Sequence, residues 1–597
     1  MQQLVTNKKK IIRTVIQIVV LVAIIGAVSF NFLTKPVYEP YTDKFSAATT
    51  DNGFIALSYF TVDQYDSKDT ISQKQLDEQL GALKAHGYVT ITQEDIKSYY
   101  KGEKLLPEKA LFLMFEDGSR NTALYAQKIL EKYNYVATMV TYGENLMKAG
   151  SELLLGNDLK DLHKSTFWEL GINGYRLSYI NVYDRYQNYL GELTSEEYFQ
   201  MEPYIDEDYN HYLMDYIRES DRIAIETNSE MSKRIENDYL LMEKTYRKSI
   251  DYLPELYVLM HSNSDGYGSD SQVSAENERH IKDMFSMNFN REGLALNKKE
   301  INSNIYDLTR LQPKNYWSTN QLLMHISEET GQEMMWQLGN EEQLDNWNIE
   351  SGAANFSREK ITLTSLREKS GEIRFLSDDS IQNLSISTIL TGNKYGCQFF
   401  DLRVNEDYSS FVHIEIINNY LKIWQKLKEE EQEMLFTLNL DEHDGLTYKT
   451  IGKDREDSLE AAKKIKKGQI TIAETNSEND SLEYIPEIKR NDTAKRNINI
   501  QLANDNLTVM IDDKQAAEVK INVFDAGEIY LGSVWGGKDF EDNNNRVNTI
   551  YDAVFENLYI EETKDDSITL LYDNTLNKFQ TFMEYLYAFW RIIRNIS

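Results

Sequence analysis

The strongest constraint on the fold is a regular alternation of buried strands and helices in the first part of the chain. Apolar runs at 54–60, 110–115 and 136–142 have the length and composition of buried strands. The segments between them place leucines at helical spacing, and Ser72 is a candidate cap for the first of these helices. Strands that alternate with helices predict a parallel α/β sheet or barrel, and the rhythm continues less regularly to about residue 343.

The pattern changes at about residue 346. From there the chain consists of short alternating segments separated by turn residues, such as 396–404 and 527–537. This pattern predicts an antiparallel β-sandwich, with a charged helical or loop insertion at 454–487. The expected fold class is therefore α/β plus all-β, preceded by a transmembrane helix.

The length of 597 residues is too great for one hydrophobic core. A net charge of −32 disfavours nucleic acid as a partner, because the phosphate backbone would be repelled. The same charge suits solubility, cation binding or a basic partner such as a partly deacetylated glycan. The single cysteine, Cys397, excludes an internal disulfide. The predicted division is 1–36 cytoplasmic tail and membrane anchor, 37–50 linker, 51–343 barrel, 346–563 β-sandwich and 564–597 aromatic amphipathic helix.

The amino-terminal segment 14–33 is almost entirely apolar and follows Lys8, Lys9, Lys10 and Arg13. About 20 apolar residues are enough to span a bilayer, and the basic flank places the amino end in the cytoplasm. A cleaved signal peptide is the alternative, although its apolar region would be shorter. We therefore expect a single-pass protein of the cell membrane with its bulk outside the cell.

The carboxyl-terminal segment 577–597 is rich in aromatic residues and isoleucine, and it carries Arg591 and Arg594. It is too short and too charged for a second span. This composition indicates a helix that lies on the membrane surface or docks to a partner. A helix packed back on its own domain is the alternative.

Two adjacent carboxylates, Glu116 and Asp117, follow the buried strand at 110–115. Acidic residues are favourable at helix amino ends, so one interpretation is that the pair caps the next helix. Barrels also place active-site residues at the carboxyl ends of their strands. On these residues alone, both interpretations stay open.

The order of motifs over residues 51–343 resembles the NodB-type polysaccharide deacetylases. The resemblance is carried by "FIALSYF", "LKAHGY", "LLPEKALFLMFEDG", "LGINGYRLSYINVYDR", "YLPELYVLMHSNSDGYG" and "LTRLQPKNYWS". It implies a distorted (β/α) barrel. It also implies hydrolysis of an acetamide by a divalent metal, usually zinc, held by one Asp and two His.

The resemblance also implies roles for individual residues. Glu116 stands at the general-base position and Asp117 at a metal-ligand position. His261 corresponds to a general acid, with an ordinary structural histidine as the alternative. Arg310 would orient a carboxylate or make a surface ion pair. These four residues form the predicted catalytic set.

The second motif departs from the family pattern. Asn173 stands where the first metal-binding histidine is expected, and Leu177 or Ser178 where the second is expected. The first strand ends in Tyr59-Phe60 in place of Tyr-His. Asparagine is a poor zinc ligand beside imidazole, so the resemblance does not carry the two His ligands to this sequence.

Several polar residues near predicted strand ends could bind a sugar through hydrogen bonds and aromatic stacking. The predicted substrate-binding residues are Asn173, Arg176, Tyr179, Asp184 and Asn263. Glu116 with a second carboxylate such as Asp184 could instead serve glycoside hydrolysis, which needs two carboxyl groups at a defined separation.

The last strands of the sandwich, "NLTVMIDDKQAAEV", "GEIYLGSVWGG" and "TIYDAVFENLYIEE", resemble lectin-like jelly rolls of the concanavalin and laminin-G type. Such domains often bind glycans and sometimes calcium. A loop with Asp539, Asp542, Asn543 and Asn544 offers the oxygen ligands that calcium prefers, and an ordinary solvated turn is the alternative.

Three functions are compatible with these patterns. The first is a membrane-anchored extracellular enzyme that removes N-acetyl groups during surface or exopolysaccharide biosynthesis. The second is an inactive relative that binds a glycan or a membrane synthase complex. The third is a glycosidase that uses the retained carboxylates.

Overall fold

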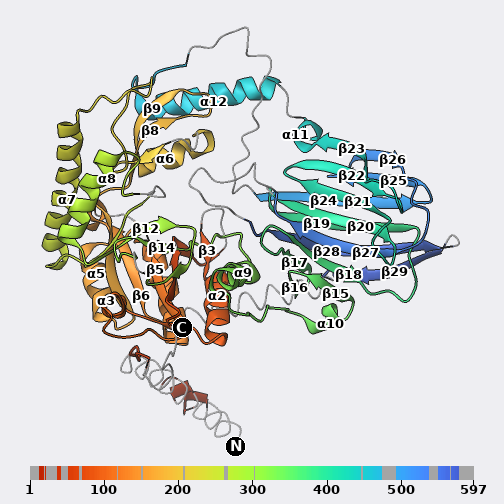
Figure 1. Ribbon diagram of the computed structural model, residues 1–597, viewed down its shortest axis with the longest axis horizontal. Helices are drawn as coiled ribbons and strands as arrows, with labels where there is room; N and C mark the ends of the chain where they lie inside the picture. The colour runs from red at the N-terminus through yellow and green to blue at the C-terminus, as the bar shows by residue number, and fades with distance from the viewer. Residues whose placement is uncertain are drawn as a thin grey trace, which may run out of the picture.

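The computed structural model describes two lobes that lie side by side (Figure 1). The first is an α/β lobe and the second is built from β-sheets. The residues described are 13–15, 17–18, 21, 36–41, 51–65, 70–116, 118–148, 152–205, 209–260, 266–300, 303–394, 396–445, 448–473, 493–536, 549–564 and 567–576.

The α/β lobe is organised around one sheet of mostly parallel strands. Its order is β13-β1-β5-β6-β7-β11-β12-β14, with β4 paired to β5. Only β13 among these is antiparallel to its neighbour. The strands are β1 Phe54–Tyr59, β4 Val89–Thr90, β5 Ala110–Phe115, β6 Ala137–Tyr142, β7 Trp168–Gly174, β11 Leu256–Val258, β12 Met287–Glu292, β13 Leu296–Asn297 and β14 Leu308–Arg310.

This sheet closes on itself. Leu311, directly after β14, accepts a hydrogen bond from the Ser58 N–H (2.9 Å) and donates one to the Ala56 carbonyl (2.9 Å). The first and last parallel strands are therefore joined, and the prediction of a barrel is confirmed. Because the barrel strands run the same way, their carboxyl ends lie at one end of the barrel.

Helices surround the barrel, as the strand-helix alternation predicts. The predicted cap at Ser72 is confirmed, because its side chain accepts a hydrogen bond from the Gln75 N–H (3.1 Å) at the start of α2. The helices of the lobe are α2 Gln73–Ala85, α3 Gln93–Lys101, α4 Arg120–Tyr133, α5 Gly156–Lys164, α6 Ser195–Met201, α7 Asn228–Ile250, α8 Ser271–Met284 and α9 Thr319–Thr330, with 3-10 turns η2 Gly143–Met147 and η3 Glu202–Tyr204.

Two small sheets accompany the barrel. One is the parallel pair β2 Val62–Asp63 and β3 Ile71–Ser72. The other is antiparallel, in the order β10-β8-β9, with bounds β8 Ser178–Tyr183, β9 Tyr189–Thr194 and β10 Asn210–His211. The second of these carries the chain directly after β7, where the motif departures lie.

The second lobe consists of two antiparallel sheets with an apolar core between them. This confirms the all-β prediction, and the jelly-roll type stays a prediction. One sheet has the order β15-β18-β27-β20-β21-β22-β23, formed by Trp347–Ser351, Ser370–Phe375, Glu528–Val534, Cys397–Val404, Phe411–Ile417, Tyr420–Lys426 and Glu433–Asn439. The other has the order β16-β17-β28-β19-β24-β25-β26, with β29 beside β28, formed by Ala353–Ser357, Lys360–Thr364, Asp552–Lys564, Leu384–Asn393, Thr493–Ala503, Asn506–Ile511, Lys514–Lys520 and Ser567–Asp573. Short helices α10 Glu341–Leu344 and α11 Leu440–His443 flank the sheets.

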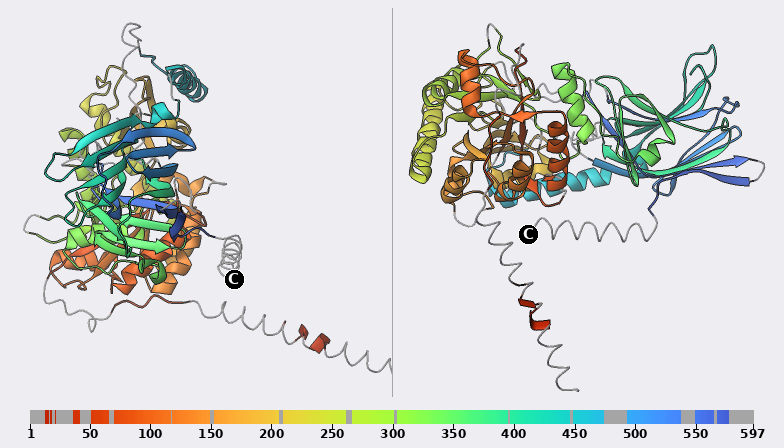
Figure 2. Two further views of the ribbon diagram at one scale, coloured as in Figure 1. Left: turned by 90° about the vertical axis from the view of Figure 1, so that its right-hand side faces the viewer. Right: turned by 90° about the horizontal axis from the view of Figure 1, so that it is seen from below.

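The first part of the predicted charged insertion, 454–466, belongs to the helix α12 Tyr448–Lys466, which packs on the α/β lobe, and residues 474–487 lie outside the described residues. We call residues 448–473 the strap. Its Ala462 is buried among side chains of β8 and β9, and Thr471 exchanges backbone hydrogen bonds with Tyr189 (3.0 and 3.1 Å). Figures 1 and 2 show α12 beside this lobe and away from the two sheets. The strap therefore packs on the α/β lobe, although in sequence it lies between α11 and β24 of the sheet lobe.

The lobes are joined at the amino end of α9. Asp552 accepts hydrogen bonds from the Ser318 N–H (2.7 Å) and Oγ (3.0 Å), and the Gln321 side chain donates to the Ile550 carbonyl (3.0 Å). The capping residue of a barrel helix is thus held by the first residue of β28.

Two predictions concern the chain ends. Within the part of the chain that the structure describes, no helix is long and apolar enough to cross a bilayer, and most of the predicted span 14–33 lies outside the described residues. Residues 567–573, inside the range 564–597 predicted as helical, form strand β29 because they pair with the long β28. Segment 577–597 lies outside the described residues.

Candidate functional site

A buried polar cluster lies at the carboxyl ends of five barrel strands. Glu116 directly follows β5, and the other members belong to the last residues of their strands. Ordinary barrel strands end in loops that expose polar groups, so a gathering of charges in the interior needs a structural or functional reason. The members are Ser58 of β1, Glu116, Asn173 of β7, Glu292 of β12 and Arg310 of β14.

Arg310 is the centre of this cluster. Its Nε lies 2.6 Å from Glu116 Oε1, and its Nη2 lies 3.2 Å from Glu116 Oε2 and 2.9 Å from Glu292 Oε1. Its Nη1 donates to the Arg291 carbonyl (3.2 Å). The side chains of Arg310 and Glu116 are 0% exposed and that of Glu292 is 2% exposed. One guanidinium therefore bridges two buried carboxylates through a planar fork of donors.

Glu116 accepts hydrogen bonds on both of its oxygens. Ser58 Oγ donates to Oε1 (2.5 Å) and Asn173 Nδ2 donates to Oε2 (3.2 Å), in addition to the two contacts from Arg310. Burial by itself would raise the pKa of this carboxyl. The charge of Arg310 and the hydrogen bonds from Arg310, Ser58 and Asn173 outweigh it, so the pKa lies below the usual 4.5. Glu116 is thus held as a carboxylate with four donors.

The structure brings together three of the residues predicted from sequence: Glu116, Arg310 and Asn173. The prediction that Arg310 orients a carboxylate agrees with its fork on Glu116. The catalytic roles of these residues stay predictions. Asp117, His261 and Asn263 lie outside the residues that the structure describes.

Arg176 belongs to a neighbouring ion pair. Its Nε donates to Asp238 of α7 (2.9 Å), and its guanidinium lies over the rings of Tyr175 (5.2 Å) and Tyr212 (4.7 Å). Burial raises the pKa of Asp238 to about 6 against the opposing effect of Arg176. Because Arg176 is 30% exposed while Asp238 is buried, the rings and the cation present a polar, aromatic surface directly after β7.

Asp184 and Tyr179 lie in a separate network beneath the strap. Asp184 is 0% exposed and accepts hydrogen bonds from the Asn188 N–H (2.7 Å) and from Ser458 Oγ of α12 (2.9 Å). Tyr179 packs against the ring of Tyr198 with a centroid distance of 4.3 Å. Among the described residues, the hydrogen bonds of Asp184 connect it to the strap and to its own turn, and none reaches Glu116. The pairing of Asp184 with Glu116 that glycoside hydrolysis would need stays a prediction without support from these contacts.

Sequence reasoning missed Ser58, Glu292 and Asp238. A signal was present for Glu292, because it ends a strand and precedes Gly293, and Glu116 likewise stands at a strand end, directly after β5 and before Asp117-Gly118. Ser58 lies inside an apolar strand and Asp238 inside a long helix. Neither pattern distinguishes a buried polar partner from an ordinary exposed one.

Curated proteins are similar to part of this chain, although the similarity covers only about a third of it. No family model matches the chain. The poly-β-1,6-N-acetyl-D-glucosamine N-deacetylase of Escherichia coli K12 is 23% identical over 220 residues, 36% of this chain and 31% of that protein. The protein of the same name from E. coli O157:H7 is 22% identical over 220 residues. The chain thus spans about a third of the length of the curated relatives it matches.

Three solved structures are examples of partial similarity to this chain. They are the deacetylase domain of BpsB from Bordetella bronchiseptica (TM-score 0.33, 13% identity, 44% of this chain and 96% of that one), a de-N-acetylase from Aggregatibacter actinomycetemcomitans (0.32, 18%, 43% and 94%) and IcaB from Ammonifex degensii (0.31, 14%, 44% and 92%).

The α/β lobe resembles a NodB-type polysaccharide deacetylase domain. The resemblance implies, as a prediction, that Glu116 stands at the position of the catalytic base and Asn173 at the position of a metal-binding histidine. The structure shows these two side chains bonded to each other (3.2 Å).

The described residues do not fit the zinc site of the deacetylases. The Asn173 amide nitrogen donates to Glu116, so its polar end belongs to the ion-pair network, and an amide is a weak zinc ligand. Within the described ranges, no group of three or more His, Cys, Asp or Glu is arranged to hold a metal ion. A divalent metal is therefore an expectation from the family. The predicted calcium loop, 539–544, lies outside the described residues.

Proposed function

We propose that this chain is a polysaccharide-binding protein of exopolysaccharide biosynthesis, in which a deacetylase-type barrel recognises an N-acetylated polymer without zinc-dependent hydrolysis. The likeness to poly-β-1,6-N-acetyl-D-glucosamine N-deacetylases supports the class of polymer. A membrane anchor at residues 14–33, an extracellular location and an association with a membrane synthase complex belong to the same proposal.

The observation that carries the proposal is the state of Glu116. A general base works best when its pKa is near the operating pH and when it can reach the proton it takes. Here the pKa lies below 4.5, the carboxylate is 0% exposed, and four donors occupy its two oxygens. The residue at the base position therefore acts as the anion that fixes Arg310 and Asn173 in the barrel.

The surface beside this cluster is suited to sugar binding. Tyr175 and Tyr212 are half-buried rings that both contact the guanidinium of Arg176, and Tyr175 and Arg176 directly follow β7. Apolar faces of sugar rings stack on aromatic side chains, and a partly exposed guanidinium donates to hydroxyl or acetamido oxygens. This surface is where we place the polymer on the barrel.

A second candidate function is metal-dependent N-deacetylation. It is favoured by the carboxylate of Glu116 at the end of β5, followed in sequence by Asp117, as the family resemblance implies.

The two candidate functions differ in the product that they leave. Incubation of the full chain with N-acetylglucosamine oligomers, followed by mass spectrometry, should show unchanged oligomers under our proposal. Loss of acetyl mass that depends on added zinc would establish the second candidate, and shortened chains would establish glycoside hydrolysis.

Binding provides the positive test. Tyr175→Ala should weaken binding of an N-acetylglucosamine polymer about tenfold, since loss of one stacking ring costs on the order of 1 kcal/mol or more. Tyr125→Ala is the matched control, because Tyr125 is a half-buried tyrosine on the helix α4 outside the barrel end. Equal affinities for the wild type and Tyr175→Ala would remove this surface from the proposal, and a wild type that binds no acetylated polymer would refute the proposal itself.

A further inference from the structure

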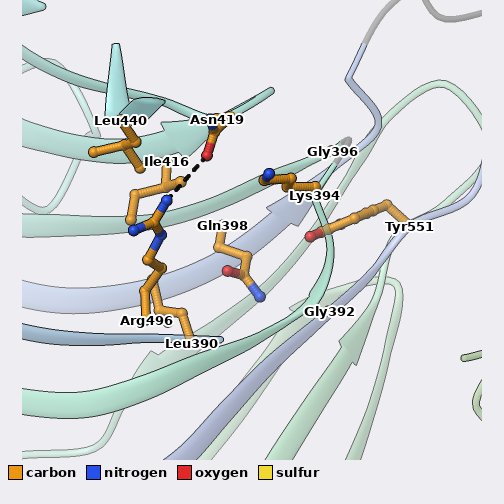
Figure 3. A pocket seen from close by; sticks show the side chains of 10 residues that line it. All are labelled: Leu390, Gly392, Lys394, Gly396, Gln398, Ile416, Asn419, Leu440, Arg496 and Tyr551. Carbon is orange, nitrogen blue, oxygen red and sulfur yellow. Dashed lines mark hydrogen bonds between the residues drawn. The ribbon is translucent and has the colours of Figure 1, made fainter. Parts of the chain in front are cut away.

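The pocket at the mouth between the two sheets is too small for a sugar unit. Gln398, Arg496 and Tyr551 are among its lining residues (Figure 3), and it has room for about one water molecule. Arg496 is held by Asp444 (2.7 Å) and Asp512 (3.2 Å). This pocket is therefore a packed end of the core, and the surface that the sheet lobe offers to a partner lies on its outside.

The outside of this lobe has an exposed apolar strand, β29. It pairs with β28 on one side, at the edge of the eight-stranded sheet. Ile568 is 67% exposed and Leu570 is 52% exposed, opposite Thr563 and Glu561 of β28. Figures 1 and 2 show the hairpin of β28 and β29 extending away from the α/β lobe. Among the described residues, none pairs with the second edge of β29, so its backbone N–H and C=O groups that point away from β28 are open to another strand.

The other sheet edges of the lobe are protected. In the same sheet, β26 carries Lys514 and Lys520, and β16 is covered by the segment 338–340, which exchanges two backbone hydrogen bonds with it (2.6 and 2.8 Å). In the other sheet, β15 carries Glu350 and β23 carries Glu433. Charged side chains and covering segments are the usual means by which natural sheets avoid edge-to-edge association. An edge without either device is therefore expected to have a strand as its partner.

The sequence of β29 allows it to pair with itself. Residues 567–572 carry no charge, in a chain whose net charge is −32. Two identical strands pair antiparallel about a two-fold axis perpendicular to the sheet, which places residues of one face opposite each other. The pairing of β29 with β28 is regular over Ser567–Leu570 and shifts at Leu571, so the axis belongs within the regular stretch.

The side chains decide where in this stretch the axis lies. An axis at Ile568 places Leu570 opposite position 566, which is an aspartate. An axis at Thr569 places Ile568 of each copy opposite Leu570 of the other, and Thr569 opposite itself. Apolar cross-strand pairs stabilise a sheet, whereas an aspartate opposite a leucine loses hydration and gains no partner. The register centred on Thr569 is therefore the favoured one.

We propose that β29 is a dimerisation strand, which pairs antiparallel with β29 of a second copy of this chain in the register centred on Thr569. The two eight-stranded sheets then form one continuous sheet across the two-fold axis. The contact is short, so we expect a reversible dimer with a dissociation constant on the order of 10 μM. This dimer requires no glycan and is independent of the proposed function. Where the proposed function holds, a dimer carries two barrel ends and binds one polymer through both, more tightly than a monomer does.

Sedimentation velocity of the full chain in a mild detergent, over a range of concentrations, tests this dimer without any glycan. The wild type should change from monomer to dimer at about 10 μM. Thr569→Lys should raise the dissociation constant about tenfold or more, because like charges directly opposite each other repel. Thr569 is exposed, so the substitution leaves the core intact. An equimolar mixture of Thr569→Lys and Thr569→Glu should restore dimers at the wild-type concentration, since opposite charges then face each other.

Gln515→Lys and Gln515→Glu are the matched controls. Gln515 is exposed on β26, the edge strand at the other side of the same sheet, so both variants should dimerise like the wild type.

A wild type that remains a monomer at about 100 μM would overturn the proposal. Slow amide exchange at Ile568–Leu571 in that monomer would assign the edge to the chain's own segment 577–597. A dimer that Thr569→Lys leaves unchanged would also overturn the proposal. So would a mixture that associates no better than its single variants, because either result places the contact outside this register.

Discussion

Removal of Arg310 gives the sharpest test of the barrel cluster. Arg310→Met keeps the length and apolar stem but leaves Glu116 and Glu292 buried, at 0% and 2% exposure, without their cation. Loss of one partner of a buried ion pair costs about 3–5 kcal/mol. Ser58 and Asn173 continue to donate to Glu116, so we expect a loss of free energy of unfolding near the lower limit, about 3 kcal/mol.

The sign of the pH dependence strengthens this test. In the wild type, the pKa of Glu116 is lowered, so its contribution to stability is present above about 4.5 and is lost as the pH falls through the lowered value. Without Arg310, burial dominates and raises the pKa of the same carboxyl. The variant should therefore recover stability as the pH falls from neutral, whereas the wild type should lose stability on acidification.

Hydrogen exchange at the amides of β5, Leu111–Phe115, reports on the barrel without requiring the whole chain to unfold in one step. Thermal unfolding of the barrel should shift down by roughly 6–12 °C for about 3 kcal/mol. Arg291→Met is the control, because Arg291 is 52% exposed in its pair with Asp307 and such pairs contribute about 1 kcal/mol or less. Equal losses in the two variants, or a stability of Arg310→Met that falls on acidification as the wild type does, would refute the reasoning.

Two further predictions concern the strap and the sheet lobe. Ala462→Asp places a charge at a position that is 0% exposed against β8 and β9, so the strap should detach and become the first site of limited proteolysis, and an unchanged cleavage pattern would contradict the packing described. Burial alone would lower the pKa of His413, but hydrogen bonds with Asp401 and Glu415 raise it to about 9, so the stability it contributes is present below 6.5 and is lost as the pH rises through about 9. The difference in thermal unfolding between wild type and His413→Asn should therefore shrink above pH 9, and a difference that stays constant would contradict this pairing.

The barrel could be predicted because its signal is local and repeated. Each buried strand appears as a short apolar run and each helix as apolar residues at helical spacing, and the cap at Ser72 depends only on the local sequence.

The strap was not predictable in the same way. Its charged sequence predicts a helical or loop insertion within the sandwich, but its few apolar residues, such as Ala462 and Ile465, pack on a sheet more than 250 residues earlier in the chain. Residues 567–573 were misassigned because strand pairing with β28 is a tertiary effect.

The candidate site shows where sequence reasoning ends. The position of Glu116 follows from the end of a strand, and its pairing with Arg310 agrees with the role inferred from the resemblance. The second carboxylate on Arg310, Glu292, has a signal at a strand end before a glycine, but that signal does not tell whether its side chain turns inward. Asp184 was grouped with Glu116 because both follow buried strands, but Asp184 belongs to a different sheet and is bound to Ser458 of the strap.

The two departures from the deacetylase pattern support each other physically. Glutamate has one methylene more than aspartate, and here both of its oxygens reach donors on three different strands. One of these donors is the amide of Asn173, at the position where the family has a metal-binding histidine. A metal-ligating imidazole would have to donate to Glu116 through its other ring nitrogen, and one new histidine at this position would still lack the second histidine that the resemblance requires. Asn173→His should therefore weaken the cluster and leave no zinc site at stoichiometric metal content, whereas tight zinc binding by this single variant would show that the barrel end keeps its metal geometry.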